Sequence, residues 1–118
     1  MSLSELLREL VTGCDALGAL IMDADGIPLA EFRSDELFDL QGCSVECLSI
    51  IRESCHATSL LESGGLEELA LLTGKFRFLV TPLDDGIWLF LVQPADGIYG
   101  KARYLMRLLR HRFLKLLA

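Results

Sequence analysis

The sequence predicts an α+β domain in which a five-stranded antiparallel sheet carries helices on both faces. Three observations lead to this class. The stretch from Leu66 to Val92, LEELALLTGKFRFLVTPLDDGIWLFLV, holds three apolar runs separated by two turn sequences. A shorter pair of strands precedes it in residues 18–32, and amphipathic helical patterns lie before, between and after the two groups. We therefore expect a single domain over residues 1–118, in the order helix, two strands, long helix, three strands, helix.

The three-stranded segment is defined by its turns. Strands over Leu66–Thr73 and Phe76–Pro82 are separated by Gly74-Lys75, and a third strand over Ile87–Val92 follows Asp84-Asp85-Gly86, whose glycine suits the positive φ of a hairpin turn. The third strand is apolar on both of its faces, so both faces of the sheet need a cover. One face carries Ile87, Leu89 and Leu91, and the other carries Trp88, Phe90 and Val92.

The N-terminal part predicts a helix followed by a hairpin. Ser2 and Glu5 have the spacing of a capping box, and a helical apolar stripe follows them. Two strands, Gly18–Met22 and Ile27–Phe32, are joined through Asp25-Gly26, a strong turn pair. The acidic turn lacks the later ligand positions of a calcium loop, so the turn interpretation is favoured.

Proline distinguishes the two edges of the predicted sheet. Pro28 cannot donate a hydrogen bond to a neighbouring strand, which places the strand Ile27–Phe32 at one edge. The strand Leu66–Thr73 has neither a proline nor a bulge signal. If it forms the opposite edge, it is open to pairing with another chain.

A long central helix is predicted from Ser34, as its N-cap, to about Leu61. Asp35 and Glu36 in the first turn interact favourably with the helix dipole. Gly42 inside this helix has two interpretations, a small-residue patch that lets another backbone approach, or a local kink. The apolar residues occupy more than one side of the helix. The main stripe comprises Leu37, Leu40, Cys47, Leu48, Ile51 and Cys55, and Phe38, Val45 and Ile50 add apolar surface elsewhere.

The last helix, over residues 97–117, carries most of the positive charge. All 17 acidic residues of this chain of net charge -6 lie between Glu5 and Asp96, whereas six of the 11 basic residues lie in the last helix. An acidic body argues against general nucleic-acid binding. We expect the six cations to be solvated or paired within the molecule, with an acidic protein partner, or a membrane or nucleic acid, as alternatives. The predicted packing face consists of Ile98, Ala102, Leu105, Leu109, Phe113 and Leu116.

The composition indicates surface that a partner buries. The chain is 52% hydrophobic, with a mean hydropathy of +0.42, which is high for a soluble protein. No apolar run approaches the roughly 20 residues that cross a bilayer, and the N-terminus lacks the pattern of a signal peptide. We therefore expect a cytoplasmic protein without a membrane span.

Residues with catalytic potential are few. Gly74-Lys75 lacks the earlier glycine and the following hydroxyl of a phosphate-binding loop. Cys55 and His56 are adjacent on a helix, so they do not face one another as a nucleophile and a base must. The four cysteines form no CxxC pair and are expected to be reduced and structural, although Cys43, Cys47 and His56 have part of the spacing of a metal site. We expect no catalytic residue, no cofactor and no bound metal.

The element order and two segments of this sequence resemble the Roadblock family. The segments are DADGIPLAEF, which forms the first hairpin, and LEELALLTGKFRFLVTPLDDGIWLFLV, which forms the three-stranded meander before the last helix. The family includes dynein light chains of the roadblock type, endosomal GTPase scaffolds and the bacterial gliding-motility GTPase-activating protein. The resemblance covers nearly the whole chain and implies a profilin-like domain that is not an enzyme. The cysteine-rich central helix departs from the family pattern.

The resemblance also implies how the chain associates. Family members form dimers in which the third strand pairs across a two-fold axis and the long helices lie side by side, and they bind Ras-like small GTPases or motor components. The implied partners are therefore a second copy of the chain and a small GTPase, which the protein either activates or only tethers; a small-molecule sensor is a further alternative. The expected dimer interface comprises Leu66, Leu69, Leu71, Thr73, Gly42 and Val45, and the expected partner surface comprises Glu46, Ser49, Arg52 and Glu53.

Overall fold

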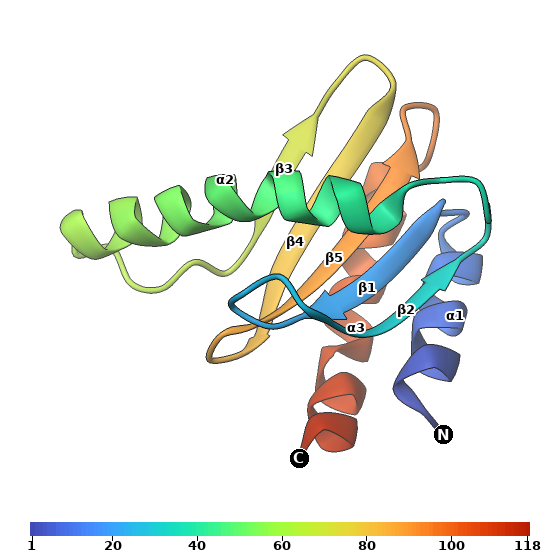
Figure 1. The fold of residues 1–118 in the computed structure, drawn as a ribbon, viewed down its shortest axis with the longest axis horizontal. Coiled ribbons are helices and arrows are strands. Elements are labelled where there is room, and N and C mark those ends of the chain that lie inside the picture. The colour runs from blue at the N-terminus through green and yellow to red at the C-terminus, as the bar shows by residue number, and fades with distance from the viewer.

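The computed structural model describes residues 1–118 as three helices and five strands (Figure 1). The elements are α1 (Leu3–Gly13), β1 (Gly18–Met22), β2 (Pro28–Arg33), α2 (Leu40–Leu60), β3 (Leu69–Leu72), β4 (Phe76–Asp84), β5 (Ile87–Pro94) and α3 (Tyr99–Leu117). The strands form one antiparallel sheet in the order β2-β1-β5-β4-β3. The predicted fold class is confirmed, β2 is an edge strand, as Pro28 predicts, and β3 forms the opposite edge.

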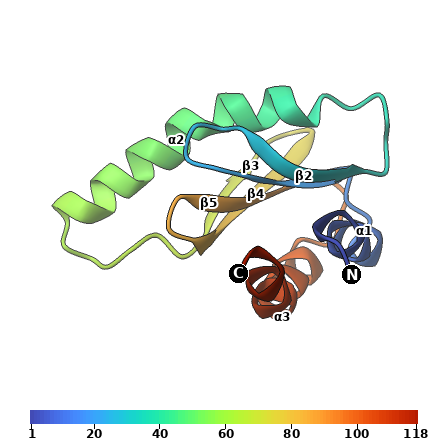
Figure 2. The same ribbon diagram turned by 60° about the horizontal axis from the view of Figure 1, so that its bottom comes forward.

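The sheet separates two helical layers. α2 crosses one face, whereas α1 and α3 lie side by side on the other (Figure 2). The central strand β5 is therefore covered on both faces, as its apolar sequence requires. Leu89 and Leu91 belong to the core under α1 and α3, whereas Phe90 and Val92 belong to the core under α2, and all four are fully buried.

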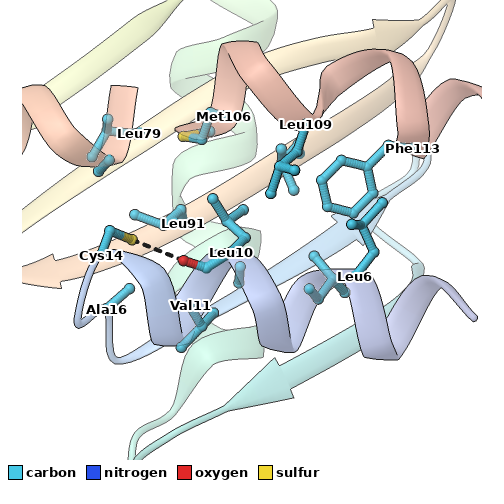
Figure 3. Close-up of a cluster of buried hydrophobic side chains, with 14 of the residues drawn as sticks. Leu6, Leu10, Val11, Cys14, Ala16, Leu79, Leu91, Met106, Leu109 and Phe113 are labelled. Atoms are coloured by element: carbon cyan, nitrogen blue, oxygen red, sulfur yellow. Dashed lines mark hydrogen bonds between the residues drawn. The ribbon is translucent and has the colours of Figure 1, made fainter. Parts of the chain in front are cut away.

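The core under α1 and α3 is the larger one, with 16 buried residues against nine under α2. Leu6 and Leu10 of α1 face Leu109 and Phe113 of α3 over the sheet (Figure 3). The start of α1 is fixed by the predicted capping box, which the structure confirms. In it the hydroxyl of Ser2 accepts the Glu5 N–H at 3.1 Å, and the Glu5 carboxylate accepts the Ser2 N–H at 3.3 Å.

The hairpin turns also follow local chemistry. One carboxylate oxygen of Asp23 accepts the N–H groups of Asp25 at 2.9 Å and Ile27 at 3.0 Å, and Gly26 has a φ of 82°. Gly86 between β4 and β5 has a φ of 71°. Both glycines lie in the left-handed region, where a side chain is unfavourable, so both predicted turns are confirmed.

The long helix begins later than the sequence predicts. Its N-cap is Asp39, which accepts the Gly42 N–H at 3.0 Å. Ser34, the predicted cap, instead donates its hydroxyl to the Ala16 carbonyl at 2.7 Å, a tertiary bond that no local pattern reveals. Leu37, which was expected in the buried stripe, lies in the turn before the helix and is 96% exposed. The other stripe residues, Leu40, Cys47, Leu48, Ile51 and, in part, Cys55, pack toward the sheet.

The third strand is shorter than predicted. It lacks residues 66–68. There the Glu67 carbonyl accepts the Thr81 hydroxyl and the Glu68 carboxylate accepts from Arg103, and backbone pairing with β4 begins only at Leu69. It also lacks Thr73, whose hydroxyl accepts the Phe76 N–H at 3.1 Å within the hairpin turn.

The packing face of α3 differs from the prediction at its two ends. Ile98 is the N-cap residue and is exposed, and Leu116 is also exposed. Met106, which was not in the predicted set, is buried against the sheet together with Ala102, Leu109 and Phe113. No helix in the structure has the length and apolar character that crossing a bilayer requires.

Candidate association and partner surface

The edge strand β3 presents an unpaired side. It pairs with β4 alone, and its four residues include no proline. Leu71 lies opposite Phe78 and Leu72 lies opposite Arg77, so these two leucines point to opposite faces of the sheet. They are 40% and 49% exposed. The outer backbone groups and the two leucines together form an edge that another strand can extend.

The C-terminal half of α2 projects beyond the sheet (Figures 1 and 2). No residue of α2 after Ile51 is fully buried. At its end, Leu60 and Leu61 are 72% and 74% exposed. These two leucines were not among the predicted site residues. The only signal for them was a pair of apolar residues just before Gly64-Gly65, which helical periodicity alone does not mark as exposed.

The residues of the expected dimer interface separate into two groups. Leu69 and Leu71 lie on β3. Val45 is exposed one turn after Gln41, whose amide donates to the carboxylate of Glu31 on β2 at 3.2 Å. Val45 therefore lies on the side of α2 that faces β2, the edge strand opposite β3. Gly42 lies in the first turn of α2, Leu66 precedes β3, and Thr73 follows it.

The four expected partner residues all lie on α2 and are exposed. Arg52 differs from the other three because its guanidinium donates to the Ala24 carbonyl in the turn between β1 and β2, at 2.8 Å. Glu46, Ser49 and Glu53 make no such contact with another element. Arg52 is thus anchored against the domain, whereas the others form an open polar surface.

A hollow of about 1040 Å³ lies between α3, β4 and residues 63–68. Arg103, Arg107 and Arg110 of α3 line it. Arg110 donates to the carbonyls of Pro82 and Leu83 at 3.1 and 3.2 Å. Arg110 is thus bound by carbonyl groups of the same chain. The hollow is a seam between α3, β4 and residues 63–68 that is lined by polar groups.

Glu68 binds the other two arginines of this seam. Its carboxylate accepts from Arg103 at 2.5 and 2.8 Å and from Arg107 at 3.0 Å. The hydrogen bonds from Arg103 hold the pKa of Glu68 below its usual value, and the same contact raises the pKa of Arg103. A further pair joins Arg112 to Glu9 of α1 at 2.9 Å. The expectation that cations of the last helix pair within the molecule is confirmed for these three arginines.

The thiols are placed for packing. All four cysteines are free, and Cys14 and Cys47 are buried. Desolvation raises the pKa of Cys14 to about 11 and also raises the pKa values of Cys43 and Cys47. A raised pKa disfavours the thiolate, which is both the nucleophile and the metal-binding form. No three His, Cys, Asp or Glu side chains converge on a point suited to a metal ion.

Comparison with known proteins identifies the fold. No family model matches the sequence, and no curated protein matches it. Solved structures do match. A Roadblock/LC7 domain from Streptomyces avermitilis superposes with a TM-score of 0.86 over 99% of this chain and 98% of that one, at 14% identity. The chain has the Roadblock/LC7 fold. The resemblance seen in the sequence is thereby confirmed at the level of the fold.

Two bacterial proteins share the Roadblock/LC7 fold of this chain. The gliding protein MglB from Thermus thermophilus matches with a TM-score of 0.84 and 17% identity, over 95% of this chain and 85% of that one. An MglB with a tetrameric arrangement matches with the same score and coverage, at 18% identity. MglC from Myxococcus xanthus has a TM-score of 0.73 and 29% identity, over 98% of both chains.

Proposed function

We propose that this protein is a non-catalytic, homodimeric regulator that binds a Ras-like small GTPase. The observation that carries the proposal is the unpaired β3 edge together with the end of α2 that projects beyond the sheet. A second copy, related by a two-fold axis, extends the sheet at β3 and covers the apolar end of α2. The tetrameric MglB supports self-association in this fold, and the Roadblock resemblance supports the class of partner.

The dimer is tested at two matched leucines. Leu71 on β3 and Leu29 on β2 are both exposed leucines on edge strands. Leu71→Lys introduces like charges near the two-fold axis and should give a monomer. Leu71→Pro removes a ladder donor and rigidifies the edge, so it should give monomers or insoluble protein. Leu29→Lys should remain dimeric. The measurement is light scattering after size-exclusion chromatography at tens of micromolar, roughly the range in which an interface of ordinary size holds. A monomeric unaltered protein at that concentration contradicts the dimer.

The regulatory role is tested by hydrolysis. GTP turnover by the Ras-like GTPase from the same source is measured with and without this protein at saturation. We expect stimulated turnover and a stoichiometry of two regulators to one GTPase, because a groove on a two-fold axis holds one asymmetric partner. Glu53→Lys should weaken binding if Glu46, Ser49 and Glu53 form that groove. Unchanged turnover with retained binding identifies a scaffold, and absent binding contradicts the proposed partner.

Arg52 is assigned a binding role in this proposal. Its guanidinium donates to the Ala24 carbonyl, so entering a partner's active site would first break that hydrogen bond. Arg52→Ala should therefore weaken binding modestly and leave the maximal stimulated rate within about tenfold, or 1.4 kcal/mol. An arginine that stabilises the transferring phosphoryl group contributes about 10³ to 10⁵ in rate. A thousandfold loss at saturating Arg52→Ala would therefore establish a catalytic arginine.

A further inference from the structure

The segment that leads into β3 is attached to other elements only just before the strand, at Glu67 and Glu68. Residues 63–68 contain no helix or strand, and a Cβ added at Gly64 or Gly65 would meet no atom within 4 Å. The hydroxyl of Ser63 bonds only within the end of α2 and its own loop. The first hydrogen bonds to other elements are made by Glu67, whose carbonyl accepts the Thr81 hydroxyl at 3.1 Å, and by Glu68.

Glu68 makes the stronger attachment. It accepts three charge-assisted hydrogen bonds from two arginines one turn apart on α3, and two of them come from Arg103 in a forked arrangement. The guanidinium of Arg103 also lies over the ring of Tyr99, 5.6 Å from its centroid. The side chains of Glu68 and Arg103 are 26% and 36% exposed, so the pair is partly shielded from solvent. A forked, partly shielded pair is stronger than an isolated surface ion pair.

β3 depends on this attachment because the strand is short. It has four residue pairs with β4 and no neighbour on its outer side. Glu68 immediately precedes the first of these pairs, at Leu69. If Glu68 were released, a single hydrogen bond, from the Thr81 hydroxyl to the Glu67 carbonyl, would hold the segment between the end of α2 and β3. The strand would then fray from its N-terminal end, which lowers the population of edges that are ready to pair.

We propose that Glu68 is a positioning residue for the β3 edge, held by Arg103 and Arg107, so that α3 sets how readily the edge pairs with a second copy. The inference rests on the proposed dimer and adds a device that regulates it. Because the attachment is ionic and partly exposed, competing ions weaken it. The dimer dissociation constant should therefore depend on salt concentration mainly through three side chains, Glu68, Arg103 and Arg107.

The test compares four variants of the full chain. Three variants each remove one charge of the network: Glu68→Gln, Arg103→Gln and Arg107→Gln. Glu67→Gln is the matched control, because the Glu67 side chain has no ion pair. Two quantities are measured: hydrogen exchange of the β3 amides that face β4, and the dimer dissociation constant by sedimentation. We expect Glu68→Gln, which removes the negative charge that all three bonds share, to raise both the exchange rate and the dissociation constant by about tenfold. The effects should decrease in the order Glu68, Arg103, Arg107, because Arg103 donates two of the three bonds. Glu67→Gln should change neither quantity by more than about twofold.

The two readouts separate this inference from the proposed function. Hydrogen exchange measured in dilute, monomeric protein tests the attachment of Glu68 whether or not a dimer forms. If the unaltered chain never dimerises, that result contradicts the proposed dimer but not the attachment. Unchanged β3 exchange in both Glu68→Gln and Arg103→Gln overturns the positioning role. Exchange that rises equally in β1 and β5 overturns it too, since that result indicates a general loss of stability. For Arg107→Gln, which removes one bond, an effect as large as that of Glu68→Gln contradicts the proposed division of the network.

Discussion

At the scale of single residues, Cys14 shows how burial decides what a side chain can do. It is buried in the core under α1 and α3, and its thiol donates to the Leu10 carbonyl at 3.2 Å (Figure 3). Desolvation raises its pKa to about 11. The same residue type on an exposed, electropositive surface would be reactive, whereas here it packs as a small apolar side chain.

The raised pKa of Cys14 predicts a loss of stability at alkaline pH. In the unfolded chain the thiol ionises near its ordinary pKa of 9.0, and in the folded chain near 11. As the pH rises through this range the unfolded state releases the proton first, so the free energy of unfolding should fall. Urea denaturation across this range measures the fall, and Cys14→Ala should show a shallower one. Equal slopes in the two proteins would show that Cys14 does not contribute.

At the scale of elements, the N-terminus of α2 explains its glycine. A Cβ at Gly42 would collide with the carboxylate of Asp39, the N-cap. The glycine therefore makes room for the cap. This close contact lies within the helix's own first turn and involves neither of the two predicted features, an approaching backbone or a kink.

A double-mutant cycle tests the role of Gly42. Glycine to alanine in a helix usually stabilises by about 1 kcal/mol, and loss of an Asp N-cap costs about 1 kcal/mol. Gly42→Ala alone should therefore change the free energy of unfolding little, because the gain offsets a displaced cap. In an Asp39→Ala background, the same substitution should stabilise by about 1 kcal/mol. Denaturant titrations of the four proteins give the coupling, and additive effects would contradict the steric account.

At the scale of the whole molecule, the two helical layers are unequally complete. The layer of α1 and α3 shares a core of 16 buried residues, whereas α2 contributes no fully buried residue after Ile51. The exposed leucines at the end of α2 and the open edge at β3 leave apolar surface on the monomer. Burial of such surface is a main driving force for association, so a dimer of the proposed kind also completes the α2 layer.

This asymmetry predicts where association protects the backbone. Amides of residues 52–60 should exchange about tenfold more slowly in concentrated, dimeric protein than in dilute protein, because they are then covered. Amides of residues 40–51, which already lie over the sheet, should change little, and those of α3 serve as an internal reference. Hydrogen exchange with mass spectrometry at two concentrations gives the comparison. Uniform exchange at residues 52–60 despite measured dimerisation would place the interface away from the end of α2.

The sequence by itself determined the features whose causes act within a few residues or along one strand. Features of this kind are the capping box of Ser2 and Glu5, the turns at Gly26 and Gly86 and the two apolar faces of β5. Together they predict the order of elements and a helical layer on each face of the sheet. That β3 lacks a proline and a bulge signal also followed from the sequence, because both are local properties, whereas its place at the edge is decided by the sheet topology.

Tertiary structure alone decided the contacts between residues distant in the sequence. The partners of Ser34, Arg52 and Glu68 lie 18, 28 and 35 residues away. The engagement of Ser34 away from the helix, the contact of Arg52 and the start of β3 therefore could not be predicted from a local pattern. The exposure of Leu60 and Leu61 has a related cause. Periodicity shows which side of a helix is apolar, but only the packing of α2 across the sheet decides which part of that side is covered.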